Sequence, residues 1–211
     1  MKIGFIGLGI MGEAMSYNVI KKHDDLVFVY DINPQQVAKV AAYGGVACSS
    51  SVEVARQADL IITVVPKSEH SLAVYTSILD VLDDTKICVD MSTIDPNVSL
   101  EIWEMLKARG CGFLDAPVVK SQEAAWLGDV GIYVGGSMET YQKVKPILKY
   151  MGRGIIHMGD NGKGLVMKVC HNALVAQIQN GVHETLALAL SQGIDLDKYS
   201  AAISYGVGQN Y

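Results

Sequence analysis

Three glycines lie close to the N-terminus with the spacing Gly-x-Gly-x-x-Gly, at Gly7, Gly9 and Gly12. They follow an apolar segment of strand character and precede a segment of helical character. In that setting glycines allow a tight turn and a close approach of the backbone to a diphosphate, and the helix N-terminus favours negative charge. A glycine turn can also do no more than pack a strand against a helix. The residues that we expect to contact a dinucleotide are Gly7, Leu8, Gly9, Ile10, Met11 and Gly12.

An acidic residue at the end of the next strand-like segment strengthens this hypothesis. Asp31 ends the segment LVFVYD, about 20 residues after the glycine turn, where a carboxylate can accept hydrogen bonds from both hydroxyls of the adenosine ribose. A carboxylate there also repels a 2′-phosphate. We therefore expect the cofactor to be NAD (NADH) rather than NADP, and we assign the following Ile32 and Asn33 to the same site.

Short β-rich segments alternate with helical stretches from residue 1 to about residue 157. Serines 49–51 and Asp95–Pro96 precede helical stretches and predict where those helices begin. This alternation predicts an α/β fold, a doubly wound parallel sheet with crossover helices on both faces, in a domain of residues 1–160. The segments of strand character are KIGFIG, LVFVYD, DLIITVV, KICVDM, GFLDAP, VGIYVG and GIIHMG.

The character of the sequence changes after Gly159. From Gly164 to about Gln192 no strand signal occurs, and leucine, isoleucine and valine recur at helical spacing. This pattern predicts one long helix that leaves the sheet domain. We expect it to open an all-helical second domain, residues 161–211, which would be incomplete in this chain.

Composition and charge exclude several classes of function. The 211 residues carry a net charge of −5, which argues against a protein that binds nucleic acid by neutralising phosphates. The longest apolar runs are far shorter than the ~20 residues that span a bilayer, so we expect no membrane contact. The cysteines form no Cys-x-x-Cys pair, which predicts no metal site and reduced thiols in or near the core of a cytoplasmic protein: Cys48, Cys88, Cys111 and Cys170.

Four stretches together resemble the β-hydroxyacid dehydrogenases, the family of 3-hydroxyisobutyrate dehydrogenase and tartronate semialdehyde reductase. They are GFIGLGIMGEAM at 4–15, DMSTIDP at 90–96, DAPVVKSQEAAWLGDVGIYVGG at 115–136 and GKGLVMKVCHN at 162–172. The resemblance extends over essentially the whole chain. It implies a Rossmann domain followed by a helical domain, hydride transfer between a nicotinamide and a small anionic hydroxy acid or aldehyde, and a homodimer or homotetramer.

The resemblance also implies roles for individual residues. Lys168 matches the catalytic lysine of the family, and Asn172 matches an asparagine that helps to hold the substrate. Thr93 matches a residue beside both nicotinamide and substrate, while Val65 and Pro66 match a loop that borders the cofactor. His171 occupies the position of another family asparagine, so it is either a substrate-facing residue or a structural histidine.

The surroundings of Lys168 agree with a special role. A lysine on a helix is usually a solvated surface residue. Here it stands in the largely apolar segment LVMKVCHNALVAQ, on one predicted helix face with His171, Asn172 and Val175. A partly desolvated lysine has a lowered pKa, and such a group could exchange a proton with the substrate oxygen near neutrality.

One loop departs from the family pattern. Where relatives read DAPVSGG, this chain has Val119, Lys120 and Ser121, so a loop that normally holds a carboxylate with backbone N–H groups is stiffer and positively charged. The sulfolactaldehyde reductase branch is similar in having a cation at the middle position, which suggests a sulfonate substrate held by Lys120 and Ser121. The alternative is that Lys120 points to solvent and the substrate is an ordinary carboxylate.

Two further functions remain open. The family includes non-catalytic members that bind NAD and act as interaction modules, and related folds reduce imines with another residue in the place of the lysine. The presence of Lys168 argues against both.

Overall fold

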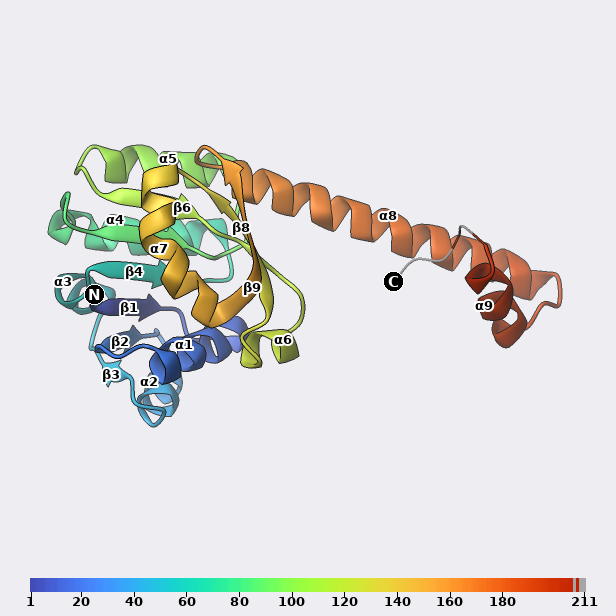
Figure 1. The fold of residues 1–211 in the computed structure, drawn as a ribbon, viewed down its shortest axis with the longest axis horizontal. Helices are drawn as coiled ribbons and strands as arrows, with labels where there is room; N and C mark the ends of the chain where they lie inside the picture. Colours follow the sequence, from blue (N-terminus) through green and yellow to red (C-terminus); the bar gives the residue numbers. More distant parts are fainter. Residues whose placement is uncertain (207, 209–211) are drawn as a thin grey trace. The chain divides into compact units, whose positions relative to one another are not determined.

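The computed structural model describes residues 1–206 and 208. The chain divides into two compact units, Met1–Lys168 and Val169–Tyr211. The first contains a nine-stranded sheet with helices on both of its faces (Figure 1). The fold class expected from the sequence, an α/β Rossmann fold followed by a helical region, is confirmed.

The sheet is built around a parallel half. Its strands are β1 (Ile3–Ile6), β2 (Val27–Tyr30), β3 (Val46–Ala47), β4 (Leu60–Thr63), β5 (Ile87–Asp90) and β6 (Gly112–Asp115), in the spatial order β3-β2-β1-β4-β5-β6. All neighbours in this half pair in parallel. The segments that follow these strands therefore meet at one edge of the sheet, which is where α/β folds bind ligands.

The alternation in the sequence predicted a wholly parallel sheet, but the remaining strands make it a mixed sheet. They are β7 (Val118–Val119), β8 (Val130–Gly135) and β9 (Gly152–Gly159). Strand β8 pairs antiparallel with β6 and β7, and β9 pairs parallel with β8. The cause is the connection after β6, which forms β7 and the five-residue helix α6 (Gln122–Trp126) instead of a helix long enough to cross the sheet.

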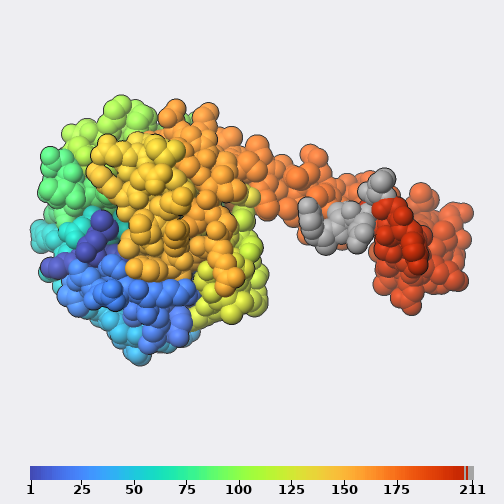
Figure 2. Space-filling model, viewed as in Figure 1, coloured from blue at the N-terminus to red at the C-terminus, as the bar shows by residue number. Residues whose placement is uncertain are grey.

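Helices cover both faces of the sheet. The core of one face includes side chains from α1 (Ile10–Lys22), α2 (Pro34–Ala41), α6 and α7 (Met138–Met151). That of the other includes side chains from α3 (Ser51–Gln57), α4 (Ser68–Ile78) and α5 (Pro96–Lys107), together with Leu165. A short 3-10 helix, η1 (Leu79–Val81), follows α4. Helices α1 and α7, far apart in sequence, lie side by side (Figures 1 and 2).

The predicted helix starts agree with the observed caps. Ser50 accepts a hydrogen bond from the N–H of Glu53 at the start of α3, and Asp95 accepts one from Asn97 at the start of α5. The predicted long helix is α8 (Lys163–Ser191), and Gly193 follows it with a φ of +79°. Helix α9 (Leu196–Ser204) completes the described elements.

In the second unit, the described elements are the rest of α8 and α9, which a short turn joins. Asp195 caps α9, and the hydroxyl groups of Thr185 and Tyr199 lie 2.7 Å apart. Cys170 is exposed in this unit, contrary to the expectation of a core position, whereas the other three cysteines are buried. Among the described helices, none has the length and apolar character needed to cross a membrane. The boundary at residue 160 that the sequence suggested stays a prediction.

Candidate active site at the carboxyl edge of the sheet

The glycine turn between β1 and α1 is a closely packed corner with one open side. A Cβ atom on Gly7, whose φ is +90°, would lie 2.2 Å from the carbonyl oxygen of Val64, and one on Gly12 would lie 2.1 Å from the oxygen of Gly7. A Cβ on Gly9 would meet nothing within 4 Å. Gly7 and Gly12 therefore pack the strand, the turn and the helix, while the space at Gly9 leaves room for a diphosphate.

The beginning of α1 is suited to an anion. Gly9 is its N-cap residue and supplies no side-chain hydrogen bond to the N–H groups of the first turn. Ile10 is exposed here, whereas Leu8 is buried in the core. Uncapped N–H groups and the helix dipole favour negative charge at this end.

Asp31 connects the glycine turn with the end of β2. Its carboxylate accepts hydrogen bonds from the backbone N–H groups of Leu8 at 2.7 Å and Asn33 at 2.8 Å. Asn33 in turn caps α2 by accepting from the N–H of Gln35. Ile32, between them, is 91% exposed, so an apolar side chain stands in solvent beside the carboxylate. Such a surface can accommodate the flat face of an adenine.

The loops after β4 and β5 reach the same edge and are tied to each other. The hydroxyl oxygen of Ser92 accepts a hydrogen bond from the N–H of Val65 at 2.8 Å. The backbone N–H of Ser92 donates to the Asp90 carboxylate at 2.9 Å. Pro66 and Thr93 are exposed on these two loops. The parallel pairing of β1, β4 and β5 thus brings the predicted residues Val65, Pro66 and Thr93 to the edge that carries the glycine turn.

Asp90 is a site residue that the sequence interpretation did not assign. It ends β5, is 1% exposed, and one of its oxygens holds the N–H of Ser92. Burial raises the pKa of its carboxyl group, and the hydrogen bonds from Ser92 oppose this shift. The position of Asp90 at a strand end within DMST was the available signal.

Lys168 lies near the start of α8, at the end of the first compact unit. Its ammonium group donates a hydrogen bond to the carbonyl oxygen of Val118 in β7 at 2.8 Å. The side chain is partly buried, and this burial lowers the pKa of the ammonium group. The expected special environment of this lysine therefore has a physical basis.

Asp115 is the second missed residue. It ends β6, is fully buried, and its carboxylate accepts hydrogen bonds from the N–H groups of Gly162 at 2.6 Å and Leu165 at 2.9 Å. These donors belong to the first turn of α8 and the residue before it. The bonds join residues that are distant in sequence, so no local pattern could predict them.

Comparison with known proteins shows the family to which this chain belongs. Residues 2–159 match the family model described as the NAD binding domain of 6-phosphogluconate dehydrogenase. A 3-hydroxyisobutyrate dehydrogenase of Pseudomonas aeruginosa is 32% identical over 99% of this chain and 71% of its own length. A 2-(hydroxymethyl)glutarate dehydrogenase of Eubacterium barkeri is also 32% identical, over the whole of this chain and 71% of its own.

The solved structure of a Mycobacterium tuberculosis 3-hydroxyisobutyrate dehydrogenase with L-serine superposes with a TM-score of 0.94 at 31% identity, over 99% of this chain and 72% of that one. The chain belongs to the β-hydroxyacid dehydrogenase family. The matches to an NAD binding domain and to dehydrogenases show that it is a nicotinamide-dependent oxidoreductase of that family. The chain spans 58% of the length of the mitochondrial 3-hydroxyisobutyrate dehydrogenase of Mus musculus. Imine reductases match at 19% identity and share the fold alone.

The loop that departs from the family pattern has its own structure. Lys120 has a φ of +85°, and among the described residues it is the non-glycine with a positive φ. This is the conformation that glycine adopts freely, which agrees with the glycine expected there in relatives. The Lys120 ammonium pairs with Asp129 at 2.8 Å and is half exposed. Ser121 caps α6 by accepting a hydrogen bond from the N–H of Ala124.

The remaining predicted substrate residues lie in the second unit. His171 is half-buried and Asn172 is exposed, both within α8. The structure therefore brings the predicted cofactor residues and Thr93 to one edge of the sheet within the first unit, and puts Lys168, Lys120 and Ser121 in that unit as well. The contact of His171 and Asn172 with a substrate stays a prediction.

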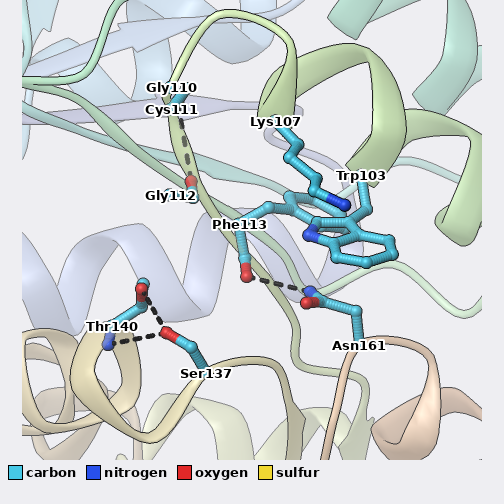
Figure 3. Close-up of a pocket in the computed structure, with 9 residues that line it drawn as sticks. All are labelled: Trp103, Lys107, Gly110, Cys111, Gly112, Phe113, Ser137, Thr140 and Asn161. Atoms are coloured by element: carbon cyan, nitrogen blue, oxygen red, sulfur yellow. Dashed lines mark hydrogen bonds between the residues drawn. The ribbon is translucent and has the colours of Figure 1, made fainter.

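A small cavity lies elsewhere, between α5, the start of β6 and the start of α7 (Figure 3). Its volume is about 160 Å³, and two of its lining residues contact each other, with the Lys107 ammonium 4.5 Å from the centre of the Trp103 ring. No predicted site residue contributes to its lining. The cavity is formed at the opposite end of β6 from Asp115, so we do not assign the chemistry to it.

Proposed function

We propose that this protein is an NAD-dependent oxidoreductase that interconverts a small β-hydroxy acid and its aldehyde acid, with Lys168 as the general acid and base. The observation that carries this proposal is the partly buried ammonium group of Lys168, which is held by the Val118 carbonyl and has a lowered pKa. A solvated surface lysine would have neither property.

The proposed cofactor site consists of the glycine turn, the strand-end carboxylate and the two neighbouring loops. The diphosphate would approach Gly9 and the N-terminus of α1, where a Cβ would meet nothing within 4 Å. Asp31 would hold the ribose hydroxyls, with Ile32 and Asn33 beside it, and its charge would disfavour a 2′-phosphate. Preference for NAD over NADP follows from this assignment.

A bound nicotinamide would supply or accept the hydride at the substrate carbon. During reduction, the Lys168 ammonium would donate a proton to the carbonyl oxygen, and during oxidation the neutral amine would accept the hydroxyl proton. The Val118 carbonyl holds the ammonium in place before the transfer. Because burial lowers the pKa of Lys168, its ammonium group gives up a proton to the substrate oxygen more readily than the ammonium group of an exposed lysine would.

The substrate is proposed to be a small anion. Relatives are named for 3-hydroxyisobutyrate, 2-(hydroxymethyl)glutarate and L-serine, which all carry a hydroxyl group and a carboxylate. Thr93, Ser121, His171 and Asn172 are the proposed substrate contacts, and Lys120 would bind the anionic end after leaving Asp129. A sulfonate-bearing aldehyde is the second candidate, because Lys120 brings a positive charge into the loop. This protein is also proposed to assemble as a homodimer or homotetramer.

The deciding experiment is a steady-state assay of the full-length protein with NADH or NAD on three- and four-carbon aldehyde acids and hydroxy acids, as matched carboxylates and sulfonates. We expect turnover with at least one member of the panel and its loss in Lys168→Ala. Cofactor binding without turnover of any substrate would favour the non-catalytic interaction module. Cyclic imines are assayed in parallel, and turnover of these alone would favour imine reduction.

A further inference from the structure

The chain segment around the end of β6 holds the beginning of α8 at three points. The Phe113 carbonyl accepts a hydrogen bond from the Asn161 side chain at 3.0 Å. Two residues later, the Asp115 carboxylate accepts from the N–H groups of Gly162 and Leu165. Three residues beyond that, the Val118 carbonyl accepts from Lys168 at 2.8 Å. The same short segment thus binds both the N-terminal end of α8 and the ammonium group of Lys168, the proposed catalytic group.

Asp115 is the charged member of this set. Its two oxygens each accept an N–H group at the N-terminal end of α8, where the helix dipole also favours a carboxylate. Burial raises the pKa of Asp115, and the hydrogen bonds from Gly162, Leu165 and Gly164 oppose that shift. A buried carboxylate that uses both oxygens on one helix end fixes that end more firmly than a single bond could.

The space around the carboxylate is shaped for close approach of the helix. A Cβ on Gly135 would lie 2.4 Å from one oxygen of Asp115, and a Cβ on Gly164 would lie 2.9 Å from the other. The same Cβ on Gly164 would lie 2.5 Å from the carbonyl oxygen of Tyr133. Side chains at these two positions would displace α8 from β6 and β8, so the glycines permit the contact that Asp115 makes.

We infer that Asp115 is a positioning residue for Lys168: its carboxylate fixes the first turn of α8 against the end of β6 and thereby places the lysine ammonium. Lys168 lies three positions after Leu165 in the helix, a rise of about 4.5 Å, over which a helix transmits displacement as a rigid body. A shift of the anchored turn would be passed to Lys168 and would break its bond to Val118. This inference rests on the proposed role of Lys168.

The test is Asp115→Asn in the full-length enzyme, alone and combined with Lys168→Ala. Asparagine has the same shape but offers one acceptor and one NH₂ donor, so one helix N–H loses its partner and faces another donor. We expect kcat to fall at least tenfold while the dissociation constant for NADH stays within twofold, because the cofactor turn lies on other strands. In the Lys168→Ala background, the same change should lower the residual kcat less than twofold.

Asp160→Asn is the matched control. It removes a carboxylate charge from the same end of α8. However, Asp160 bonds to that helix through its backbone carbonyl, which accepts from the N–H of Lys163 and which the substitution keeps. We expect kcat within twofold of wild type. A loss equal to that of Asp115→Asn would show that charge alone matters and would overturn the inference. If Asp115→Asn fails to fold, Asp115→Ser replaces it, since the shorter side chain leaves room for a water to accept the second N–H.

Two other outcomes overturn the inference. Wild-type kcat in both Asp115 variants would show that the anchor does not place Lys168. An equal fold-loss with and without Lys168 would show that Asp115 acts on the protein at large and not through the lysine. If Lys168→Ala itself keeps wild-type turnover, the proposed function fails instead, so the two failures are distinguishable.

Discussion

Replacement of Lys168 by alanine should separate catalysis from folding. The substitution removes one hydrogen bond, from the ammonium to the Val118 carbonyl, and that side chain is only partly buried. The carbonyl can then be solvated, so the cost to the free energy of unfolding should be about 1 kcal/mol or less. Loss of a positioned general acid usually lowers a rate by 10²–10⁴, which for 100-fold corresponds to about 2.7 kcal/mol of activation free energy.

The assay compares kcat, the NADH dissociation constant and the thermal midpoint of wild type and Lys168→Ala in the full-length protein. We expect kcat to fall about 100-fold or more, with NADH binding unchanged, because Lys168 lies on none of the loops that carry the cofactor residues. Lys163→Ala is the matched control: it removes an exposed lysine from the same helix and should change kcat less than twofold. Turnover of Lys168→Ala within threefold of wild type would remove this lysine from the mechanism.

The pH dependence gives an independent check on the same group. In the oxidation direction the neutral amine is the active form, so the rate should rise as the pH passes through the pKa of Lys168. In the reduction direction the ammonium is active, and the rate should fall through the same pKa. Since burial lowers this pKa, both transitions should occur below the value near 10.4 of an ordinary lysine. Profiles that persist unchanged in Lys168→Ala would assign the transitions to another group.

Other predictions concern the cofactor and the substrate. Asp31→Asn should narrow the preference for NADH over NADPH in kcat/KM, and a wild type that prefers NADPH would contradict the assignment. Gly12→Ala should lower the thermal midpoint and weaken NADH binding, because the added Cβ would lie 2.1 Å from the Gly7 carbonyl; binding as tight as in wild type by fluorescence titration would refute this reasoning. Lys120→Ala should raise KM about tenfold for sulfonate or doubly charged substrates and less for carboxylates. A change below twofold for both would make Lys120 a surface lysine held by Asp129.

The sequence predicted the parallel half of the fold well because its signals are local. Each longer strand is a short apolar run bounded by turn residues, and the glycine turn follows the first of them directly. The residues expected at the cofactor site all follow strands of that half, so correct strand assignment was enough to bring Asp31, Val65 and Thr93 to one edge. Strands β3 and β7 were missed because two residues carry no periodicity.

Non-local bonds account for what the sequence did not reveal. Whether β8 pairs parallel or antiparallel with β6 depends on the structure of the connection between them. The residues of β8, VGIYVG, are compatible with either direction. The ion pair of Lys120 with Asp129 and the bond of Lys168 to Val118 depend on tertiary packing. For Lys120, the sequence left a substrate-facing and a solvent-facing position open. The structure adds an ion-pair partner, Asp129 on the other side of α6, which any anionic substrate would have to displace.

Three aspartates stand at the carboxyl ends of β2, β5 and β6, in the parallel half of the sheet, and each organises a different piece of the site. Asp31 holds the glycine turn through Leu8, Asp90 holds Ser92 and through it the Val65 loop, and Asp115 holds the beginning of α8. Their exposure separates their roles. Asp90 and Asp115 are at most 1% exposed, so a ligand cannot reach their oxygens, whereas Asp31 is only partly buried. A carboxylate oxygen can accept more than one hydrogen bond. Asp31 alone of the three can therefore hold the protein backbone and still receive the hydroxyl groups of a ribose.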